Sequence, residues 1–263
     1  MVLSRHCFYS LRKSIMKTVL VTAATRMELA ALMEAVGGET RSDAACRAFF
    51  EGRLGECDVI AAVTGIGKVN TAMGLTMLLG RYRPGLVINT GCAGAYPGSG
   101  LAAGDLAVAT TEIYGEEGVE TRGGWLSLEK IGLPLYDRGN GRYFNEIPLS
   151  ASAREDAMDI ARELGQTLVA GKFITVSACS GSEARGRELA TRFGAVCENM
   201  EGAAAAQVAL CHGVDCLEIR GISNDVEDRD LSRWNIPLAV EKVQQFLLRA
   251  IPSLLAGGRS SHR

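Results

Sequence analysis

The chain has 263 residues, of which 47% are hydrophobic and 22% charged, and its formal net charge is −2. This composition is typical of a soluble globular protein that is long enough to bury one large core. The near balance of charges excludes a basic surface for nucleic acid or anionic lipid, and no apolar run reaches the roughly 18 residues of a membrane span.

Strands and helices alternate through the first half of the chain. Residues 1–15 are basic and lack a signal-peptide pattern, so we interpret them as an extension, disordered or not native, and begin the fold at Met16. The pattern then predicts a strand at Thr18–Ala23, a helix at Thr25–Val36, a hairpin of strands Ala48–Leu54 and Cys57–Val63, a helix after the Gly-rich turn at Thr64, and strands Leu86–Asn89 and Asp105–Ile113. The stretch Tyr114–Leu149 is Gly-rich and aperiodic, which indicates a long surface excursion rather than a separate domain.

The second half continues the alternation and defines the fold class. It predicts helices at Ala151–Leu164, Ser182–Phe193, Glu201–His212 and Pro237–Leu255, and strands at Thr167–Ser177, Ala195–Cys197 and Val214–Ile222. Such alternation predicts a three-layer αβα sandwich with a central mixed, mostly parallel sheet. We expect one domain over residues 16–257 and a short tail at 258–263.

Cysteine and histidine usage limits the chemistry. The eight cysteines are scattered without a C-x-x-C pair, which together with the absence of a signal peptide favours a reducing cytoplasm. Of three histidines, His6 and His262 lie near the termini, so only His212 remains in the body and a multi-histidine metal site is excluded. The Gly-rich turn at Thr64 lacks the glycines of a dinucleotide fingerprint and the Lys-Ser/Thr of a P-loop. We therefore expect neither a metal nor a cofactor, and carboxylates as the catalytic acids and bases.

Four segments together resemble the nucleoside phosphorylase/nucleosidase superfamily, especially its methylthioadenosine/S-adenosylhomocysteine nucleosidase branch. They occur in the family's order: AATRMEL (Ala23–Leu29), TGIGKVNTA (Thr64–Ala72), the Gly-rich INTGCAGAYPGSGLAAGDLAVAT (Ile88–Thr110), and ENMEGAAAAQVA with EIRGISNDVEDRD (Glu198–Asp230). Three details resemble the futalosine hydrolases within this superfamily: Tyr96-Pro97, CENMEGAAAA, and RGISN followed by an acidic run and Trp234. The resemblance implies hydrolysis of futalosine to hypoxanthine and its dehypoxanthinyl sugar, on a route to menaquinone.

Glu28 matches the family's water-activating carboxylate. Cleavage of an N-glycosidic bond develops positive charge on the ribose, so a carboxylate beside the anomeric carbon can orient and deprotonate water and stabilise the sugar cation. The alternative is structural, because Thr25-x-x-Glu28 is also a capping box in which Glu28 reaches back to a backbone N–H.

Met200 and Glu201 match the pair that holds the nucleoside in the family. The resemblance places Met200 against the sugar and base and gives Glu201 the ribose hydroxyls. The structural alternative is that Asn199 caps a helix, Glu201 lies in its first turn and Met200 fills the core.

The segment Ser223-Asn224-Asp225 departs from the Ser-Asp of adenine-cleaving relatives. Either Asn224 takes the place of the aspartate, or one residue is inserted and Asp225 does. We favour Asn224, since an amide can donate to O6 or N7 of a 6-oxopurine while its carbonyl accepts, although an Asx turn would explain the same residues.

Other residues are assigned to substrate binding by their place in the same motifs. The Gly-rich loop contributes Cys92, Ala93 and Gly94, and the loop after the strand Thr167–Ser177 contributes Cys179 and Ser180, although Cys92 could equally be a buried structural thiol. Candidates for the far end of a large substrate, which in futalosine carries an aromatic carboxylate, are Tyr96, Arg229 and Trp234. A surface salt bridge of Arg229 with Asp228 or Asp230 and a core tryptophan are the alternative.

Water is the expected nucleophile, because the arginines that hold phosphate in phosphorylases are missing from the first turn and from the segment before the Gly-rich loop. Three alternatives stay open: a nucleosidase for methylthioadenosine, S-adenosylhomocysteine or aminodeoxyfutalosine, a purine nucleoside phosphorylase, and a non-catalytic nucleoside-binding protein. The expected partners are a purine nucleoside and water, and the resemblance implies a homo-oligomer.

Overall fold

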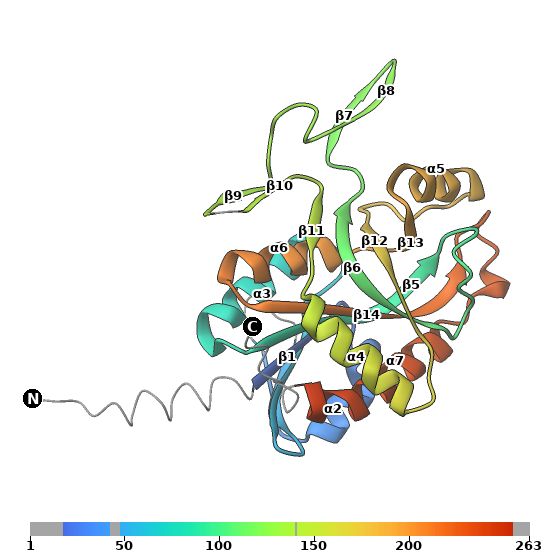
Figure 1. The fold of residues 1–263 in the computed structure, drawn as a ribbon. Coiled ribbons are helices and arrows are strands. Elements are labelled where there is room, and N and C mark those ends of the chain that lie inside the picture. Colours follow the sequence, from blue (N-terminus) through green and yellow to red (C-terminus); the bar gives the residue numbers. More distant parts are fainter. Residues whose placement is uncertain (1–17, 43–47, 140, 255–263) are drawn as a thin grey trace, which may run out of the picture.

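The computed structural model describes residues 18–42, 48–139 and 141–254, in which a ten-stranded mixed sheet carries helices on both faces (Figure 1). The predicted αβα architecture is confirmed. The predicted N-terminal extension and C-terminal tail lie outside the described residues. None of the described helices is both long enough and apolar enough to cross a membrane.

The first half of the chain forms one edge of the sheet and its central strands. Its elements are β1 (Thr18–Ala23), the 3₁₀ turn η1 (Met27–Leu29), α2 (Ala30–Val36), β2 (Glu39–Arg41), β3 (Ala48–Leu54), β4 (Cys57–Val63), α3 (Lys68–Tyr82), β5 (Leu86–Ala95) and β6 (Leu106–Tyr114). The strands β1 and β4 are buried runs rich in β-branched residues that end at polar or glycine-containing turns. The hairpin of β3 and β4 was predicted with the bounds observed.

The second half adds the remaining strands and the helices that cover them. After the excursion come α4 (Ala151–Glu163), β12 (Leu168–Thr175), α5 (Glu183–Phe193), β13 (Ala195–Asn199), α6 (Gly202–His212), β14 (Asp215–Asp225), η2 (Leu231–Arg233) and α7 (Ile236–Leu254). Serine side chains cap α4 and α5 by accepting a backbone N–H of the first turn. Glycines in the left-handed conformation end α5 and α6.

Parallel pairing holds the centre of the sheet together, from β4 through β1 and β5 to β14, and again from β6 through β12 to β13. Short antiparallel contacts join β13 to β5 and β14 to β6. The strands β5, β14, β6, β12 and β13 therefore close into a ring. This closure brings the carboxyl ends of β5, β13 and β14 to the same part of the molecule.

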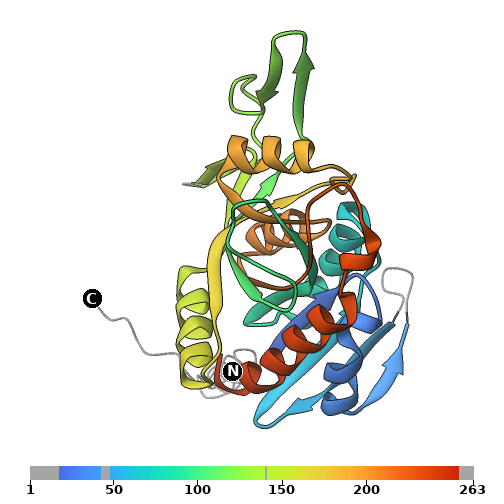
Figure 2. The ribbon, with the colours of Figure 1, turned by 90° about the vertical axis from the view of Figure 1, so that its right-hand side faces the viewer.

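Two helical layers enclose the sheet. Apolar residues of α2, α4 and α7 pack in one core cluster, and α4 and α7 lie side by side on this face (Figure 2). The opposite face is covered by α3 and α6, whose leucines and alanines pack in a second cluster. The helix α5 packs beside β13 through Leu189. Both apolar faces of the sheet are thus covered, as a largely parallel sheet requires.

The structure differs from the sequence prediction chiefly in three regions. The helix predicted from Thr25 begins as the 3₁₀ turn η1 and becomes α-helical only at Ala30. The predicted Gly-rich loop after Asn89 continues as strand to Ala95, because Thr90–Ala95 pair with β14 along their whole length. The predicted aperiodic excursion contains two hairpins, β7 (Gly118–Thr121) with β8 (Gly124–Ser127) and β9 (Tyr136–Arg138) with β10 (Gly141–Tyr143), followed by β11 (Glu146–Pro148), which joins the edge of the main sheet. The hairpin of β7 and β8 projects away from the body in both views (Figures 1 and 2).

Candidate active site

A cavity lies at the carboxyl ends of β1, β5, β13 and β14, where side chains from segments distant in the sequence converge. Ligand sites occur at such strand ends in α/β proteins. Eleven of the fourteen residues predicted to act on or bind substrate line this one cavity: Glu28, Cys92, Ala93, Gly94, Cys179, Ser180, Met200, Glu201, Ser223, Asn224 and Trp234. The predicted chemistry requires Glu28 and Glu201 to lie in the same pocket. Both line this cavity.

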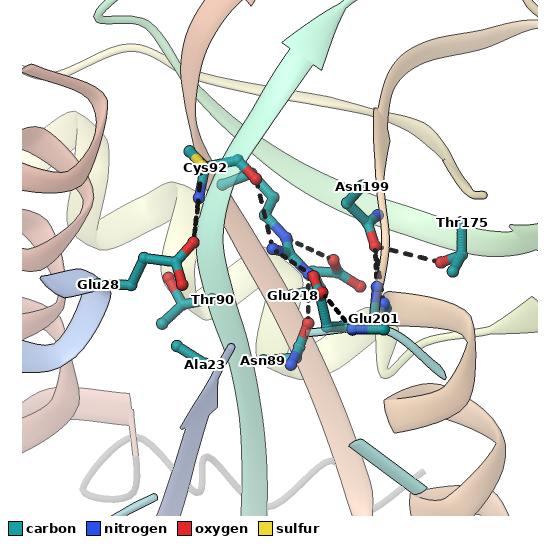
Figure 3. Close-up of polar contacts among 12 residues, drawn as sticks. Ala23, Glu28, Asn89, Thr90, Cys92, Thr175, Asn199, Glu201 and Glu218 are labelled. Carbon is teal, nitrogen blue, oxygen red and sulfur yellow. Dashed lines mark hydrogen bonds and ion pairs between the residues drawn. The ribbon is translucent and has the colours of Figure 1, made fainter. Parts of the chain in front are cut away.

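Glu28 lies in the 3₁₀ turn after β1 and its carboxylate uses both oxygens. Oε2 accepts from the backbone N–H of Thr25 at 2.9 Å and from the Thr25 hydroxyl at 2.8 Å. Oε1 accepts from the backbone N–H of Cys92 at 3.1 Å, so the carboxylate links the 3₁₀ turn to strand β5 (Figure 3). The capping interaction of the structural alternative is therefore present, and the carboxylate also lines the cavity.

Close approach of Glu28 to the floor of the cavity depends on Gly91. A Cβ built at this position would overlap Glu28 Oε1 and would lie 2.9 Å from Nη1 of Arg220. Gly91 also has φ of +144°, which side chains rarely adopt. Glycine here lets a carboxylate and a guanidinium approach the same short stretch of backbone from two sides.

Cys92 is a poor nucleophile in this setting. Burial is the main cause that raises the pKa of its thiol to about 12, and the neighbouring Glu28 contributes more to this rise than Arg220 takes away. The thiol therefore stays protonated at neutral pH, and its sulfur lies 3.6 Å from Glu28 Oε1 as a weak donor. The contribution of Cys92 to the site is its backbone N–H and its shape.

Glu201 lies immediately before α6 and is almost completely buried, with an exposed fraction of 4%. Its Oε1 accepts from the backbone N–H of Gly67 at 3.0 Å, which ties it to the Gly-rich turn before α3. Its Oε2 lies 3.4 Å from Arg220. Burial raises the pKa of Glu201, while Arg220 and the Gly67 N–H lower it again. The carboxylate is thus held from two sides at the cavity wall.

Asn199 and Arg220 fix the position of Glu201. The Asn199 side-chain oxygen accepts from the backbone N–H groups of Glu201 and Gly202, which is the helix cap of the structural alternative (Figure 3). Arg220, only 1% exposed, donates to Glu218 at 2.8 Å, to Asn89 at 2.6 Å and to the carbonyl of Cys92 at 3.4 Å. Burial alone would lower the pKa of Arg220, but Glu218 and Glu201 outweigh it and raise the pKa.

The structure distinguishes Asn224 from Asp225. Asn224 is buried and lines the cavity, whereas Asp225 is exposed and lines a separate groove on the other side of the strand. Successive strand residues point to opposite faces, so only one of the two can face a ligand. The Asn224 side chain accepts from the Ser223 hydroxyl at 2.8 Å and donates to the Asp225 carbonyl at 2.9 Å, which leaves one amide proton for a ligand.

Glu198 is a cavity residue that the sequence interpretation missed. Its Oε1 accepts from the Ser180 N–H at 2.7 Å, and its Oε2 accepts from the Ser180 hydroxyl at 2.6 Å and the Tyr96 hydroxyl at 3.0 Å. Tyr96 itself does not line the cavity; it is buried behind Glu198. Three hydrogen bonds leave this carboxylate one acceptor site free.

Trp234 lines the cavity, whereas Arg229 does not line it and lies beside the Trp234 ring. The guanidinium of Arg229 is 5.5 Å from the centre of the Trp234 ring, while Arg229 itself is exposed and has no ion pair among the described residues. The predicted alternative of a salt bridge to Asp228 or Asp230 is therefore wrong for the described part of the chain. The indole N–H of Trp234 is buried and has no hydrogen-bond partner there.

Glu218 and Arg220 carried a signal that the sequence interpretation did not use. Glu218 and Arg220 are two residues apart in the otherwise apolar strand β14, so both point to the same side of it. Opposite charges at such a spacing in a buried strand indicate an internal ion pair. Glu198 gave no comparable signal, because its strand β13 is short and ends at Asn199.

Comparison with known proteins places the chain in a family. Residues 18–252 match the Phosphorylase superfamily, and the chain belongs to it. It is 36% identical over 193 residues to a futalosine hydrolase of Thermus thermophilus, covering 73% of this chain and 79% of that protein. It is also 33% identical over 205 residues to a 5′-methylthioadenosine/S-adenosylhomocysteine nucleosidase of Geobacillus kaustophilus, covering 78% and 83%.

Solved structures share the fold. A methylthioadenosine/S-adenosylhomocysteine nucleosidase of Neisseria meningitidis in complex with methylthio-immucillin-A superimposes with a TM-score of 0.78 at 22% identity, over 90% of this chain and 99% of that one. A futalosine hydrolase of Helicobacter pylori gives 0.77 at 23% identity, over 90% and 98%. The family and the named relatives together identify the chain as an N-glycosidase of the nucleosidase class.

Proposed function

We propose that this nucleosidase hydrolyses the N-glycosidic bond of futalosine, releasing hypoxanthine and the dehypoxanthinyl sugar, as a step toward menaquinone. The observation that carries the proposal is the convergence of Glu28, Glu201 and Asn224 on one cavity. The relative in Thermus thermophilus named futalosine hydrolase supports the same substrate. The cytoplasmic location and the homo-oligomer stay predictions.

On the sugar side, Glu28 would bind and deprotonate the attacking water. Its two oxygens are already oriented by Thr25 and Cys92, so a water bound to it needs little further ordering. Glu201 would accept hydrogen bonds from the ribose hydroxyls. These bonds strengthen as positive charge develops on the ring, which lowers the barrier to bond cleavage.

On the base side, Asn224 and Glu198 suit a 6-oxopurine. Hypoxanthine offers an N1–H donor and an O6 acceptor, whereas adenine has an acceptor at N1 and a donor at the exocyclic amine. The free amide proton of Asn224 can donate to O6 or N7, and the free acceptor site of Glu198 can receive N1–H. Adenine would place its N1 lone pair against a carboxylate, which disfavours it.

At the outer end, Trp234 and Arg229 suit the aromatic carboxylate of futalosine. The unpartnered indole N–H of Trp234 can donate to an anionic group, and the exposed guanidinium beside it adds a positive charge. A methylthio group would leave both donors without an acceptor.

Water is supported as the nucleophile over phosphate. Arg220 lies behind the cavity wall, but its guanidinium is occupied by Glu218, Glu201, Asn89 and a backbone carbonyl. Arg26, the cation nearest to Glu28 in the sequence, is exposed with its guanidinium 5.6 Å from the centre of the Phe50 ring. Arg220 is therefore not free to hold a phosphate dianion, and Arg26 does not line the cavity.

The experiment is a substrate panel on the purified protein. Futalosine, aminodeoxyfutalosine, methylthioadenosine and S-adenosylhomocysteine are each supplied with and without phosphate, and hypoxanthine and adenine are separated by chromatography. We expect hypoxanthine from futalosine at a rate independent of phosphate. Adenine release without hypoxanthine would instead establish the nucleosidase named in the Geobacillus relative, and phosphate dependence would establish a phosphorylase.

A further inference from the structure

Two carboxyl groups that the proposed mechanism does not use lie directly behind Glu201. Glu112 of β6 and Glu218 of β14 are both completely buried. A Cβ built at Gly202, the first residue of α6, would overlap Glu112 Oε1 and Glu218 Oε2 at once. These two oxygens therefore flank the same point, where only a glycine leaves room for both.

The hydrogen bonds around the two groups leave one oxygen unsatisfied. Glu112 accepts from Asn199 Nδ2 at 2.6 Å and from the Thr175 hydroxyl at 2.7 Å. Glu218 Oε1 accepts from Arg220 Nε at 2.8 Å, whereas Glu218 Oε2 is buried without a donor among the described residues. A buried oxygen without a donor is costly, and a proton on the adjacent Glu112 would supply one.

The charges around the pair lead to the same conclusion. Burial raises the pKa of Glu112 well above its ordinary value, and the proximity of Glu218 raises it further. The titratable or charged groups that face the pair are Tyr114 of β6, Cys197 of β13, Glu201, and Cys216 and Arg220 of β14. Arg220 is the one cation in this set, so it cannot balance two further buried carboxylates in addition to Glu201.

We propose that Glu112 and Glu218 share a single proton, and that this acid pair positions Glu201 at the cavity wall. The second half of the proposal rests on the proposed function, in which Glu201 holds the ribose. Neither glutamate lines the cavity, so they are positioning residues that act through other side chains.

Two routes connect the pair to Glu201. Through the backbone, Glu112 holds the Asn199 amide, whose oxygen accepts from the N–H of Glu201 at 2.9 Å (Figure 3). Through side chains, Glu218 holds Arg220, which reaches Glu201 Oε2 at 3.4 Å. The shared proton joins the two routes, so that both sides of Glu201 are fixed by one buried unit.

The substitution Glu218→Gln removes the shared proton but keeps the hydrogen bonds that position Glu201. The glutamine oxygen can accept from Arg220 as Oε1 does, and its NH₂ can donate to Glu112 in place of the shared proton. The pair then keeps one negative charge and its hydrogen bonds, but Glu112 is ionised. By contrast, Glu218→Leu leaves both Arg220 Nε and Glu112 without their partner.

The test compares wild type with Glu218→Gln and Glu218→Leu, and uses Glu155→Gln, an exposed position on α4, as the control. We expect the infrared difference spectrum of wild type minus Glu218→Gln at pH 7 to contain one protonated carboxyl stretch. We expect kcat/KM to stay within about threefold of wild type in Glu218→Gln and to fall about ten- to a hundredfold in Glu218→Leu. Glu155→Gln should change neither the protonated carboxyl band nor kcat/KM.

Two results would overturn the inference. The first is a difference spectrum without a protonated carboxyl band, which needs no substrate and does not depend on whether Glu218→Leu folds. The second is a loss of kcat/KM in Glu218→Gln as large as that in Glu218→Leu. If the substrate panel shows cleavage of another nucleoside, the kinetic comparison is repeated with that nucleoside while the spectrum stands unchanged, so failure of the proposed substrate and failure of the shared proton remain distinct.

Discussion

The two sides of the cavity are built differently. On the sugar side, Glu28 and Glu201 are held by residues 64 and 134 positions away in the sequence, and Glu201 also contacts the buried Arg220. On the base side, Glu198 is likewise held by Tyr96, 102 positions away, but Asn224 bonds only to its immediate neighbours Ser223 and Asp225 among the described residues. The sugar side is therefore part of the core, whereas Asn224 is positioned locally. We infer that the reaction is tied to the fold, while the choice of base can change without disturbing it.

The largest expected effect is the loss of the water-activating carboxylate. Glu28→Gln keeps a similar shape but cannot accept a proton, so we expect kcat to fall about a hundred- to ten-thousandfold. Glu34→Gln, on the exposed side of the following helix, serves as the matched control. Single-turnover kinetics with the preferred nucleoside measure both. If Glu28→Gln keeps a rate within a few-fold of wild type, Glu28 acts only as the cap of its turn.

The sugar side should also be the side on which stability depends. Arg220→Met removes the cation from Glu201 and Glu218, and breaking such a buried pair costs about 3–5 kcal/mol of unfolding free energy. Urea unfolding followed by circular dichroism gives this value. Arg233→Met, which loses only exposed ion pairs, should change it by less than about 1 kcal/mol. Equal losses in the two variants would remove the distinction between core and surface ion pairs.

On the base side, a substitution should alter selectivity and leave the fold intact. Asn224→Asp replaces a donor by an acceptor, so we expect kcat/KM for 6-oxopurine nucleosides to fall about ten- to a hundredfold relative to 6-aminopurine nucleosides. The melting temperature should stay close to that of wild type. Asp225→Asn, on the opposite face of the strand, provides the control. A change of selectivity in Asp225→Asn but not in Asn224→Asp would reverse the assignment.

The smallest expected effect is on the pH dependence of stability. Because the pKa of Glu112 is raised in the folded protein, folding retains a proton that the unfolded chain has lost above the ordinary glutamate pKa. Its contribution to stability is complete below that ordinary value and declines as pH rises toward the raised one, by at most about 1.4 kcal/mol per pH unit. Unfolding free energies from pH 5 to 8 should thus decline more steeply in wild type than in Glu218→Gln. Parallel curves would contradict a shared proton.

Local patterns predicted most of the fold. The strands at Thr18–Ala23 and Cys57–Val63 follow from β-branched runs, and the strand at Ala48–Leu54 follows from its two phenylalanines and the Gly-Glu turn after it. The structure has all three with the predicted bounds. The extension of β5 to Ala95 could not be predicted in this way, because glycine and cysteine have no strong strand preference. It depends on pairing with β14, more than 120 residues later.

The candidate site was predictable where residues lie in recognisable motifs. Glu28, Glu201 and Asn224 were chosen from such motifs, and the structure places them around one cavity. The residues that support them could not be predicted from motifs, because Glu198 and Glu112 acquire their surroundings only through the closed ring of strands. The choice between Asn224 and Asp225 depended on a shift of register in β14 between Ile222 and Asn224, which no local pattern reveals.

The crowding at Gly202 ties the residue at that position to its two acidic neighbours. Any larger residue there would displace Glu112 or Glu218, so a random mutant library should recover Gly202 variants only together with a shorter side chain at 112 or 218. Each such variant would have to change two residues on two different elements together: Gly202 of α6 and either Glu112 of β6 or Glu218 of β14. We therefore expect Gly202 to change in evolution only together with one of these two glutamates, and not by a single substitution.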